Sequence, residues 1–538
     1  MRLENVINEK LHRIEKRYYI TMIGAILCGL IAHLYQFTNK IFNYDELGQT
    51  PGGYGAGVSL GRWGLQAIGD IMLKYYGACS LPLISGLITL LFVSLSACVI
   101  VYIFDIKDKV CCFLIGGIIS TFPTLVATYF FMFTAPYYGL SMLLSCISSY
   151  LTIHALNSWS KKKSNGICSI LCYSVGIIIL AFAIGIYQSY CAVTLSILLI
   201  YAVMDFYADK KDFKDIFFEG IGFCISFVIS LGVYLLVSKL AVCVTGIQLD
   251  DYRGASDMAA IDLKKLLYSI YRTYISYYGL MTKYDICQIN CDRIIRLAFI
   301  LLNIFVIAVI VRRIKHGGNL LNIIGFLLTI LALPMAMFFP IILIHAQSDV
   351  SNCYTLMMYS VCFAFIFPII LYDKEEIKNI SFKAFFIRDL WGIVVAGAIT
   401  FSIIIYIWFA NGNYQAMQYT NMHDLAYFET MATQIKSLDG YNADMTVAIV
   451  GNEFSDPTFQ AGSLLGDRFD IDGKWETNVN YFNNIYLWSS YLGYTPNIIE
   501  MKDSGYLKNN PEVESMPTYP NDGSIKIVDG MVIVKASN

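Results

Sequence analysis

The sequence predicts an all-α polytopic membrane protein that carries a small extracytoplasmic α/β domain at its C-terminus. Its 538 residues are 57% hydrophobic and only 14% charged, and the mean hydropathy is +0.57. A soluble domain of this length would be far less apolar. Apolar runs of about 20 residues, the length that crosses a roughly 30 Å hydrocarbon core, recur along the first 410 positions. We therefore predict a transmembrane domain, 1–410, and an extracytoplasmic domain, 411–538.

About eleven apolar runs are predicted to be transmembrane helices. Their bounds are 18–37, 80–104, 110–132, 136–157, 167–187, 190–208, 217–243, 293–311, 319–344, 353–372 and 390–410. The first run follows a long N-terminal region of mixed charge and has no small-residue cleavage site. We expect it to be a signal anchor that stays in the protein.

The basic residues predict the orientation of the helices. They gather in the segments expected on one side of the membrane: Lys10, Arg13, Lys16, Arg17, Lys107, Lys109, Lys161, Lys162, Lys163, Lys210, Lys211, Lys214, Arg312, Arg313, Lys315, Lys374, Lys378, Lys383 and Arg388. The short turns 188–189 and 345–352, expected on the other side, contain no Lys or Arg. The positive-inside rule then places the N-terminus in the cytoplasm and the tail outside. The tail agrees, with 16 acidic residues against 7 basic.

The cysteines indicate small apolar side chains rather than a disulfide framework. Most of the 15 lie inside apolar runs, and the tail has none. Cys287 and Cys291 are the only pair well inside an external loop. A disulfide between them and two free thiols are both open.

Two external regions are predicted to contain helices at the membrane surface. In 38–79, the stretch Trp63–Tyr76 places its apolar side chains on one helical face. In 244–292, apolar residues and tyrosines repeat at helical spacing from Leu263 to Tyr278. For the second stretch, a helix at the membrane surface and a helix buried against the bundle both fit the pattern.

The tail is predicted to fold as a small α/β domain. A helix over 413–438 precedes a buried strand that ends at Gly451, and a helical stretch follows near 478–492. Two short strands, Ile525–Val528 and Met531–Lys535, flank Asp529-Gly530, which is a strong hairpin signal.

The distribution of ionisable residues favours an enzyme over a transporter. The few inside the predicted spans lie near helix ends: His33, His154, Asp205, Glu219 and Lys239. An ion-coupled pump would need such groups at mid-membrane, and many transporters contain internal repeats, of which none is visible. The alternative function is transport or flipping of a lipid-linked sugar or polysaccharide, and a third is a non-catalytic envelope scaffold.

The most informative external element is Asn43-Tyr44-Asp45-Glu46, directly after the first helix. A glycine-rich run follows and ends in Gly61-Arg62-Trp63. The adjacent carboxylates can serve as a general base, an ion site or a divalent metal site, or they can be solvated loop. The glycines match neither a P-loop nor a dinucleotide fingerprint, and no zinc spacing or GxSxG elbow occurs. No cofactor is predicted, and a divalent metal ion on the two acids is left open.

Four short motifs, in this order, resemble those of one family. They are the Phe-Asn-x-Asp-acid element that contains Asp45, Gly61-Arg62-Trp63, Phe122-Pro123-Thr124, and Tyr187-Gln188-Ser189. The chain resembles the bacterial Gtr-type (type II) membrane glucosyltransferases that modify O-antigen, within the GT-C superfamily. The tail segments Met516–Pro520 and Gly523–Gly530 are similar to the C-terminal domain of that family.

The resemblance implies a GT-C-like bundle in the bacterial plasma membrane and a hexosyltransferase, with glucose as the favoured sugar. The donor would be a polyprenyl-phosphate hexose and the acceptor a cell-envelope polysaccharide on the outer face. The implied partners are this donor, this acceptor, the lipid bilayer, a flippase and a donor synthase, with no nucleic acid.

The resemblance also implies roles for individual residues. Asp45 would deprotonate the acceptor hydroxyl, with Glu46 positioning the acceptor or sharing the role. A cation must meet the donor phosphate, and Arg62 is the first candidate and Arg253 the second. The remaining substrate-binding candidates are Trp63, Tyr54 and Tyr137, which could stack on sugar rings, and Gln188 and His345.

Structural roles for the same residues stay open. Asp45 can be a solvated loop acid, and Arg62 can be a structural cation paired with it. Gln188 can cap a turn, and His345 can be a hydrogen-bond partner at a helix end. Two departures from the family pattern leave the base undecided and the donor contacts incomplete: the family has two aspartates where this chain has Asp45-Glu46, and the loop between the ninth and tenth helices offers only His345.

Overall fold

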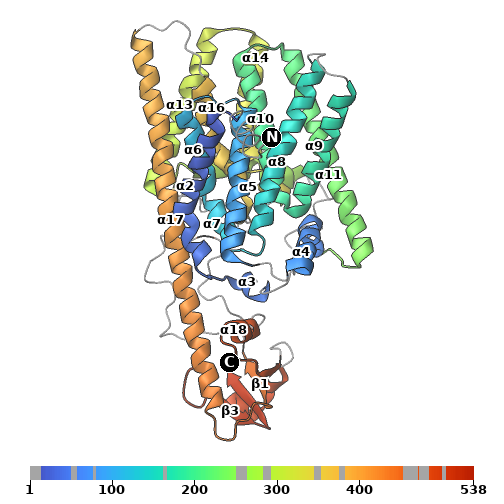
Figure 1. Cartoon of the computed structure of the whole chain (residues 1–538), viewed down its shortest axis with the longest axis vertical. Helices are drawn as coiled ribbons and strands as arrows, with labels where there is room; N and C mark the ends of the chain where they lie inside the picture. Colours follow the sequence, from blue (N-terminus) through green and yellow to red (C-terminus); the bar gives the residue numbers. More distant parts are fainter. Residues whose placement is uncertain are drawn as a thin grey trace, which may run out of the picture.

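The structure, a computed structural model of the whole chain, is a long helical bundle with a small sheet at one end (Figure 1). The residues that it describes are 14–49, 57–76, 80–160, 166–249, 263–282, 292–344, 353–374, 382–451, 471, 484–499 and 505–537.

Within these residues, nine helices are long and apolar enough to cross a membrane. They are α2 (Lys16–Thr38), α5 (Pro82–Ile103), α8 (Ala135–Ser160), α9 (Gly166–Ile186), α10 (Cys191–Ala208), α11 (Phe213–Thr245), α13 (Arg293–His316), α14 (Leu320–Met337) and α17 (Phe382–Lys436). A tenth span results if α6 (Lys109–Thr121) and α7 (Pro123–Tyr129), which meet at a bend of 42°, are counted together. The bend lies at Pro123, because the residue before a proline is driven out of the helical region.

The predicted span 353–372 is not one continuous helix, so the described residues contain nine or ten candidate spans where eleven were predicted. This segment forms two short 3₁₀ turns, η6 (Thr355–Met357) and η7 (Tyr359–Cys362), followed by α16 (Phe363–Lys374). α16 has 12 residues, which at 1.5 Å per residue gives about 18 Å, less than the hydrocarbon core. Its apolar side chains are buried in the bundle. They therefore form protein core, which composition alone does not separate from a lipid-facing span.

The two helices predicted at the membrane surface both form. α4 (Trp63–Tyr76) contacts α9 and α11 at the same end of the bundle as the sheet (Figure 1). α12 (Leu263–Gly279) turns its small polar residues, such as Ser269 and Thr273, toward the protein. Its apolar residues are exposed instead, including Leu267 and Tyr271. This outward apolar face disfavours the alternative of a helix buried against the bundle.

The last membrane span and the first helix of the predicted tail domain are one helix, α17. Its 55 residues run along the bundle and continue to the sheet (Figure 1). The sheet has the order β2-β1-β4-β3, with β2 (Asn497–Ile499), β1 (Thr446–Val450), β4 (Met531–Lys535) and β3 (Ile525–Val528). The predicted hairpin is confirmed: β3 and β4 are antiparallel, and Asp529 and Gly530 both have positive φ. The short helices α18 (Asn484–Ser490) and α19 (Pro511–Ser515) complete this C-terminal domain.

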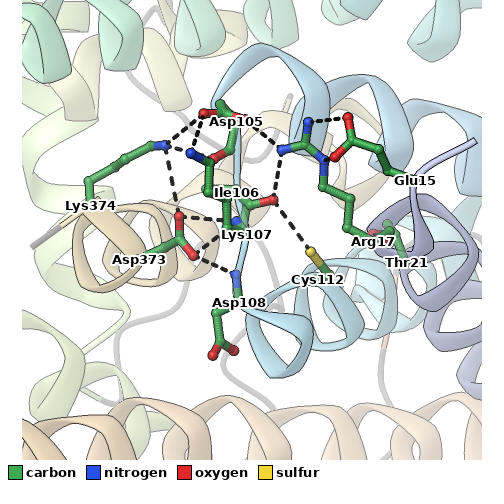
Figure 2. Close-up of polar contacts among 10 residues, drawn as sticks. All are labelled: Glu15, Arg17, Thr21, Asp105, Ile106, Lys107, Asp108, Cys112, Asp373 and Lys374. Atoms are coloured by element: carbon green, nitrogen blue, oxygen red, sulfur yellow. Dashed lines mark hydrogen bonds and ion pairs between the residues drawn. The ribbon is translucent and has the colours of Figure 1, made fainter.

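Several of the basic residues predicted on one side of the membrane lie together at the end of the bundle opposite the sheet, among them Arg17, Lys107, Arg313 and Lys374 (Figure 1). A cavity of about 780 Å³ lies there among the ends of α5, α10, α13 and α16. Figure 2 shows the ion pairs beside it, in which Asp105 binds Arg17 at 2.6 Å and Asp373 accepts the N–H groups of Lys107 and Asp108. Because the acidic residues that line the cavity are held by neighbouring cations and N–H groups, we interpret this network as structural.

Candidate functional site

The predicted acidic element forms a short helix, α3 (Tyr44–Gln49), just beyond the end of α2. It lies between the bundle and α18 of the C-terminal domain (Figure 1). Asn43 caps α3, because its side-chain Oδ1 accepts the backbone N–H of Glu46 at 2.9 Å. Asp45 and Glu46 occupy the first turn, where a helix favours negative charge.

Glu46 is buried and holds α3 against the bundle. Its side chain is 3% exposed, one carboxyl oxygen accepts the hydroxyl of Ser80, and the other accepts the backbone N–H of Phe133 at 3.2 Å. Burial raises the pKa of Glu46 to about 8, although the N–H groups of Phe133 and Met132 and the charge of Lys40 oppose this shift. The carboxyl of Glu46 is therefore mainly protonated near neutral pH.

Asp45 has the opposite environment from its neighbour. Its side chain is exposed, so a substrate can reach it. The surrounding protein still raises its pKa by desolvation, and the positive charge of Arg62 opposes that rise. A carboxylate that is accessible, close to a cation and somewhat more basic than usual is suited to general base catalysis.

Arg62 lies on a platform of tyrosines. Its guanidinium is 4.8 Å from the ring centroid of Tyr187, and its Nη1 donates to the hydroxyl of Tyr138 at 3.5 Å. The rings of Tyr138 and Tyr187 stack with centroids 4.4 Å apart. This platform limits the freedom of the guanidinium, which lowers the entropy lost when it binds an anion.

The turn before Arg62 depends on a glycine and on Gln188. Gly61 has a φ of +71°, and a Cβ there would lie 2.6 Å from the hydroxyl of Tyr234. Gln188 donates from Nε2 to the carbonyl of Leu60 at 2.7 Å and to Tyr234 at 3.1 Å. Gln188 thus holds the turn from which Arg62 projects, while its predicted contact with substrate stays a prediction.

Trp63 packs on α9. A Cβ at Gly185 would lie 2.5 Å from the indole ring, and the ring centroid of Phe182 is 5.7 Å away. Protein therefore covers at least one face of the indole, so a sugar ring could stack only on the part of the indole that stays uncovered. Tyr137 is buried, 6% exposed, in the first turn of α8, next to Tyr138.

Arg62 thus lies near enough to Asp45 for its charge to affect the pKa of that carboxyl, and the neighbouring Glu46 is buried in the protein. Other predicted residues lie outside the described residues: Tyr54, Arg253, Cys287, Cys291 and His345. Among the described residues, no group of three His, Cys, Asp or Glu side chains could hold a metal ion.

Sequence reasoning missed several residues that shape this site. Ser80 and the N–H of Phe133 hold Glu46, and the ring of Tyr138 supports Arg62. Asn421 and Tyr491 of the C-terminal region contact the segment that leads to α3. All of these are distant in sequence, so only the fold brings them to the acids. Tyr187 alone had a signal, because it stands in the motif Tyr187-Gln188-Ser189.

The comparisons with known proteins identify the family of the chain. The family model of "Glucosyl transferase GtrII" matches residues 34–365, more than half of the chain. The match contains the whole of α3, the turn at Gly61 and the tyrosine platform. No curated protein and no solved structure matches the chain. The chain therefore belongs to the GtrII glucosyl transferase family, whose members are membrane glycosyltransferases.

Proposed function

We propose that this glucosyltransferase moves a hexose, with glucose favoured, from a polyprenyl-phosphate donor to a cell-envelope polysaccharide on the outer face of the membrane. The observation that carries the proposal is an accessible carboxyl, Asp45, within electrostatic reach of a cation, Arg62, at one end of a membrane bundle. A lipid-linked donor could reach this end laterally from the bilayer, and a glycan acceptor from the aqueous side.

In the proposed reaction, Asp45 acts on the acceptor and Arg62 acts on the leaving phosphate. The acceptor oxygen attacks the anomeric carbon and gives its proton to Asp45. The bond from that carbon to the phosphate oxygen breaks, and the polyprenyl phosphate departs with the bonding electrons. Arg62 stabilises the charge that develops on this leaving group. The proton and the charge are thus both accommodated without a further reactant.

Glu46 has a structural part in this scheme. Because burial favours its protonated form, Glu46 cannot readily accept the acceptor proton at neutral pH. Its contacts with Ser80 and Phe133 instead fix the first turn of α3, from which Asp45 projects. The sequence alone did not decide which of the two acids is the base. The burial of Glu46 favours Asp45.

The decisive experiment compares carboxyl variants in a transfer assay. Purified protein receives a synthetic polyprenyl-phosphate glucose and an envelope glycan, and transferred sugar is counted. Asp45→Asn should lower transfer by roughly 10² to 10⁴-fold, the usual worth of a general base. Asp70→Asn is the matched control, because Asp70 is an exposed carboxyl in α4 that is bound to Gln66 at 2.7 Å.

Full activity of a folded Asp45→Asn protein would sink the assignment of the base. The transporter alternative predicts no transferred sugar in this assay, and instead predicts that the protein, placed in liposomes, moves labelled lipid across the bilayer. A scaffold would show neither activity, and all carboxyl variants would behave alike.

A further inference from the structure

The segment between α2 and α3 is fastened to α17 by one amide side chain. Asn421 accepts the backbone N–H of Phe42 at its Oδ1, 2.9 Å, and donates from its Nδ2 to the carbonyl of Phe42, 2.8 Å. Phe42 is 1% exposed and Asn421 is 4% exposed. A buried pair of this kind fixes both position and orientation of the backbone, since each partner would otherwise leave an unsatisfied polar group.

The side chain of Phe42 belongs to the core of the C-terminal domain. Together with Leu47 of α3 it packs in the cluster that contains Phe428 of α17 and Trp488 of α18. The ring centroid of Phe42 is 4.6 Å from that of Tyr491, at the end of α18.

Lys40 adds a second contact between this segment and the same tyrosine. The ammonium of Lys40 lies 4.7 Å from the ring centroid of Tyr491. The segment before α3 is therefore held from two separate elements, through Asn421 of α17 and through Tyr491 after α18.

α3 cannot position its acids alone. It has six residues, and a helix this short is not stable in isolation. Contacts with the bundle, through Glu46, and with the C-terminal domain, through Phe42 and Leu47, therefore decide where Asp45 lies.

We propose that the C-terminal domain is a positioning element of the active site, in which Asn421 and Tyr491 hold the segment before α3 so that Asp45 faces the substrates beside Arg62. This inference rests on the proposed role of Asp45. It assigns a role in positioning the active site to residues 411–538, which the match to the family does not cover.

The first test uses Asn421→Ala in the full-length protein, with Asn411→Ala as its matched control. Asn411 also lies on α17 and donates to backbone carbonyls of α2, those of Ile31 at 3.1 Å and Ala32 at 3.3 Å. Both variants remove an amide contact between α17 and the chain near α2, but only Asn421 touches the segment before α3. We expect Asn421→Ala to lower kcat about 10 to 100-fold, the effect of a displacement of about 1 Å, with a smaller change in the KM for donor. Asn411→Ala should keep kcat within about twofold of that of the unchanged protein. A roughly 10 to 100-fold loss of kcat requires a misplaced reacting group, and Asn411 does not contact the segment that carries Asp45.

The pH profile separates positioning from general damage. Desolvation by the surrounding protein raises the pKa of Asp45, and the charge of Arg62 opposes the rise. A base acts when deprotonated, so its pKa sets the acidic limb of kcat/KM. If Asn421→Ala releases α3 toward water, that pKa falls and the acidic limb moves to lower pH. A purely structural loss of folded protein would lower the whole profile without moving the limb.

The second test approaches the same segment from the other element. Tyr491→Ala removes the ring against Phe42 and Lys40, and should reproduce the kcat loss and the shift of the limb. Tyr491→Phe keeps the ring and should retain activity. The inference is overturned if Asn421→Ala and Tyr491→Ala, both folded, keep kcat and the acidic limb. Asp45→Asn, assayed in parallel, distinguishes this inference from the proposed function. If Asp45→Asn is inactive while Asn421→Ala is active, the proposed function is supported and only the positioning role of the C-terminal domain is refuted.

Discussion

Glu46 accepts a hydrogen bond from the backbone N–H of Phe133, which lies 3.2 Å away across 87 positions of sequence. Phe133 belongs to the turn between α7 and α8, so this bond joins the acidic helix to the bundle. Asp45, the adjacent residue, remains exposed. Two neighbouring acids therefore have different tasks, one in holding the helix and one in facing the substrates.

The buried Glu46 makes stability depend on pH. Its pKa of about 8 in the folded protein lies above the ordinary 4.5, so the folded state binds a proton that the unfolded state has lost between these values. The contribution of Glu46 to the free energy of unfolding is fully present below about pH 4.5 and is lost as pH rises toward 8. The loss is on the order of a few kcal/mol. Glu46→Gln, which mimics the protonated form, should flatten the decline. Thermal unfolding in detergent from pH 5 to 8.5 measures it, and an unchanged slope would contradict the shifted pKa.

The planar shape of the Arg62 guanidinium should contribute to transfer in addition to its positive charge. Arg62→Lys keeps the positive charge but loses the planar group that lies on Tyr187. We expect it to lower transfer by about 10-fold or more, and Arg62→Ala by about 10² to 10³-fold, in line with the loss of one stabilising donor at a developing charge. Lys74→Ala is the control, since Lys74 is a cation of α4 next to Tyr75. Equal activity of the Lys and Arg proteins would argue against a bound phosphate at this platform.

The cluster around Lys211 should support stability and not catalysis. Its ammonium binds Asp205 at 2.8 Å and Glu219 at 2.7 Å, at the end of the bundle opposite α3. Lys211→Met leaves two partly buried carboxylates without their cation, and should cost roughly 1–3 kcal/mol of stability. Lys210→Met, the exposed neighbour, should cost less than about 0.5 kcal/mol. Melting temperatures measure both, and transfer by the folded fraction should be unchanged in each.

The sequence predicted the helices by length and apolarity, and most of them form as expected. The exception, 353–372, is apolar because it lies in the protein core, and periodicity carries no signal that separates core from lipid contact in so short a segment. α17 shows the same limit in another form. The break expected after 410 is absent: α17 continues past this position, and polar residues such as Asn421 bind the segment before α3.

The candidate site was predictable only in part, because some of its residues are close in sequence and others come from distant elements. Asp45 and Arg62 are close in sequence, within one external segment and within motifs, so local reasoning reached both. The partners that decide their chemistry, such as Phe133, Tyr138 and Tyr491, come from other elements. Whether an acid is buried or exposed depends on those partners, so the sequence, although it favoured Asp45 as the base, did not show that Glu46 is buried.

Trp63 offers a test of packing against sugar binding. Its indole ring covers Gly185 of α9, where a Cβ would approach within 2.5 Å of the ring. Gly185→Ala should therefore push α4 outward and cost about 1–3 kcal/mol, the usual penalty of overpacking. Gly166→Ala, on the same helix with nothing within 4 Å of the added Cβ, should be neutral or slightly stabilising. Melting temperatures of the two variants measure this difference.

Combining Gly185→Ala with Trp63→Phe makes the test specific. The smaller ring leaves room for the new methyl group, so the double variant should recover stability relative to Gly185→Ala alone. If the indole only packs α4 on α9, activity should recover together with stability. If its free surface also stacks on a sugar, the double variant should be stable while its KM for donor or acceptor stays raised. Recovery of neither would mean that the ring does not set the distance between the two helices.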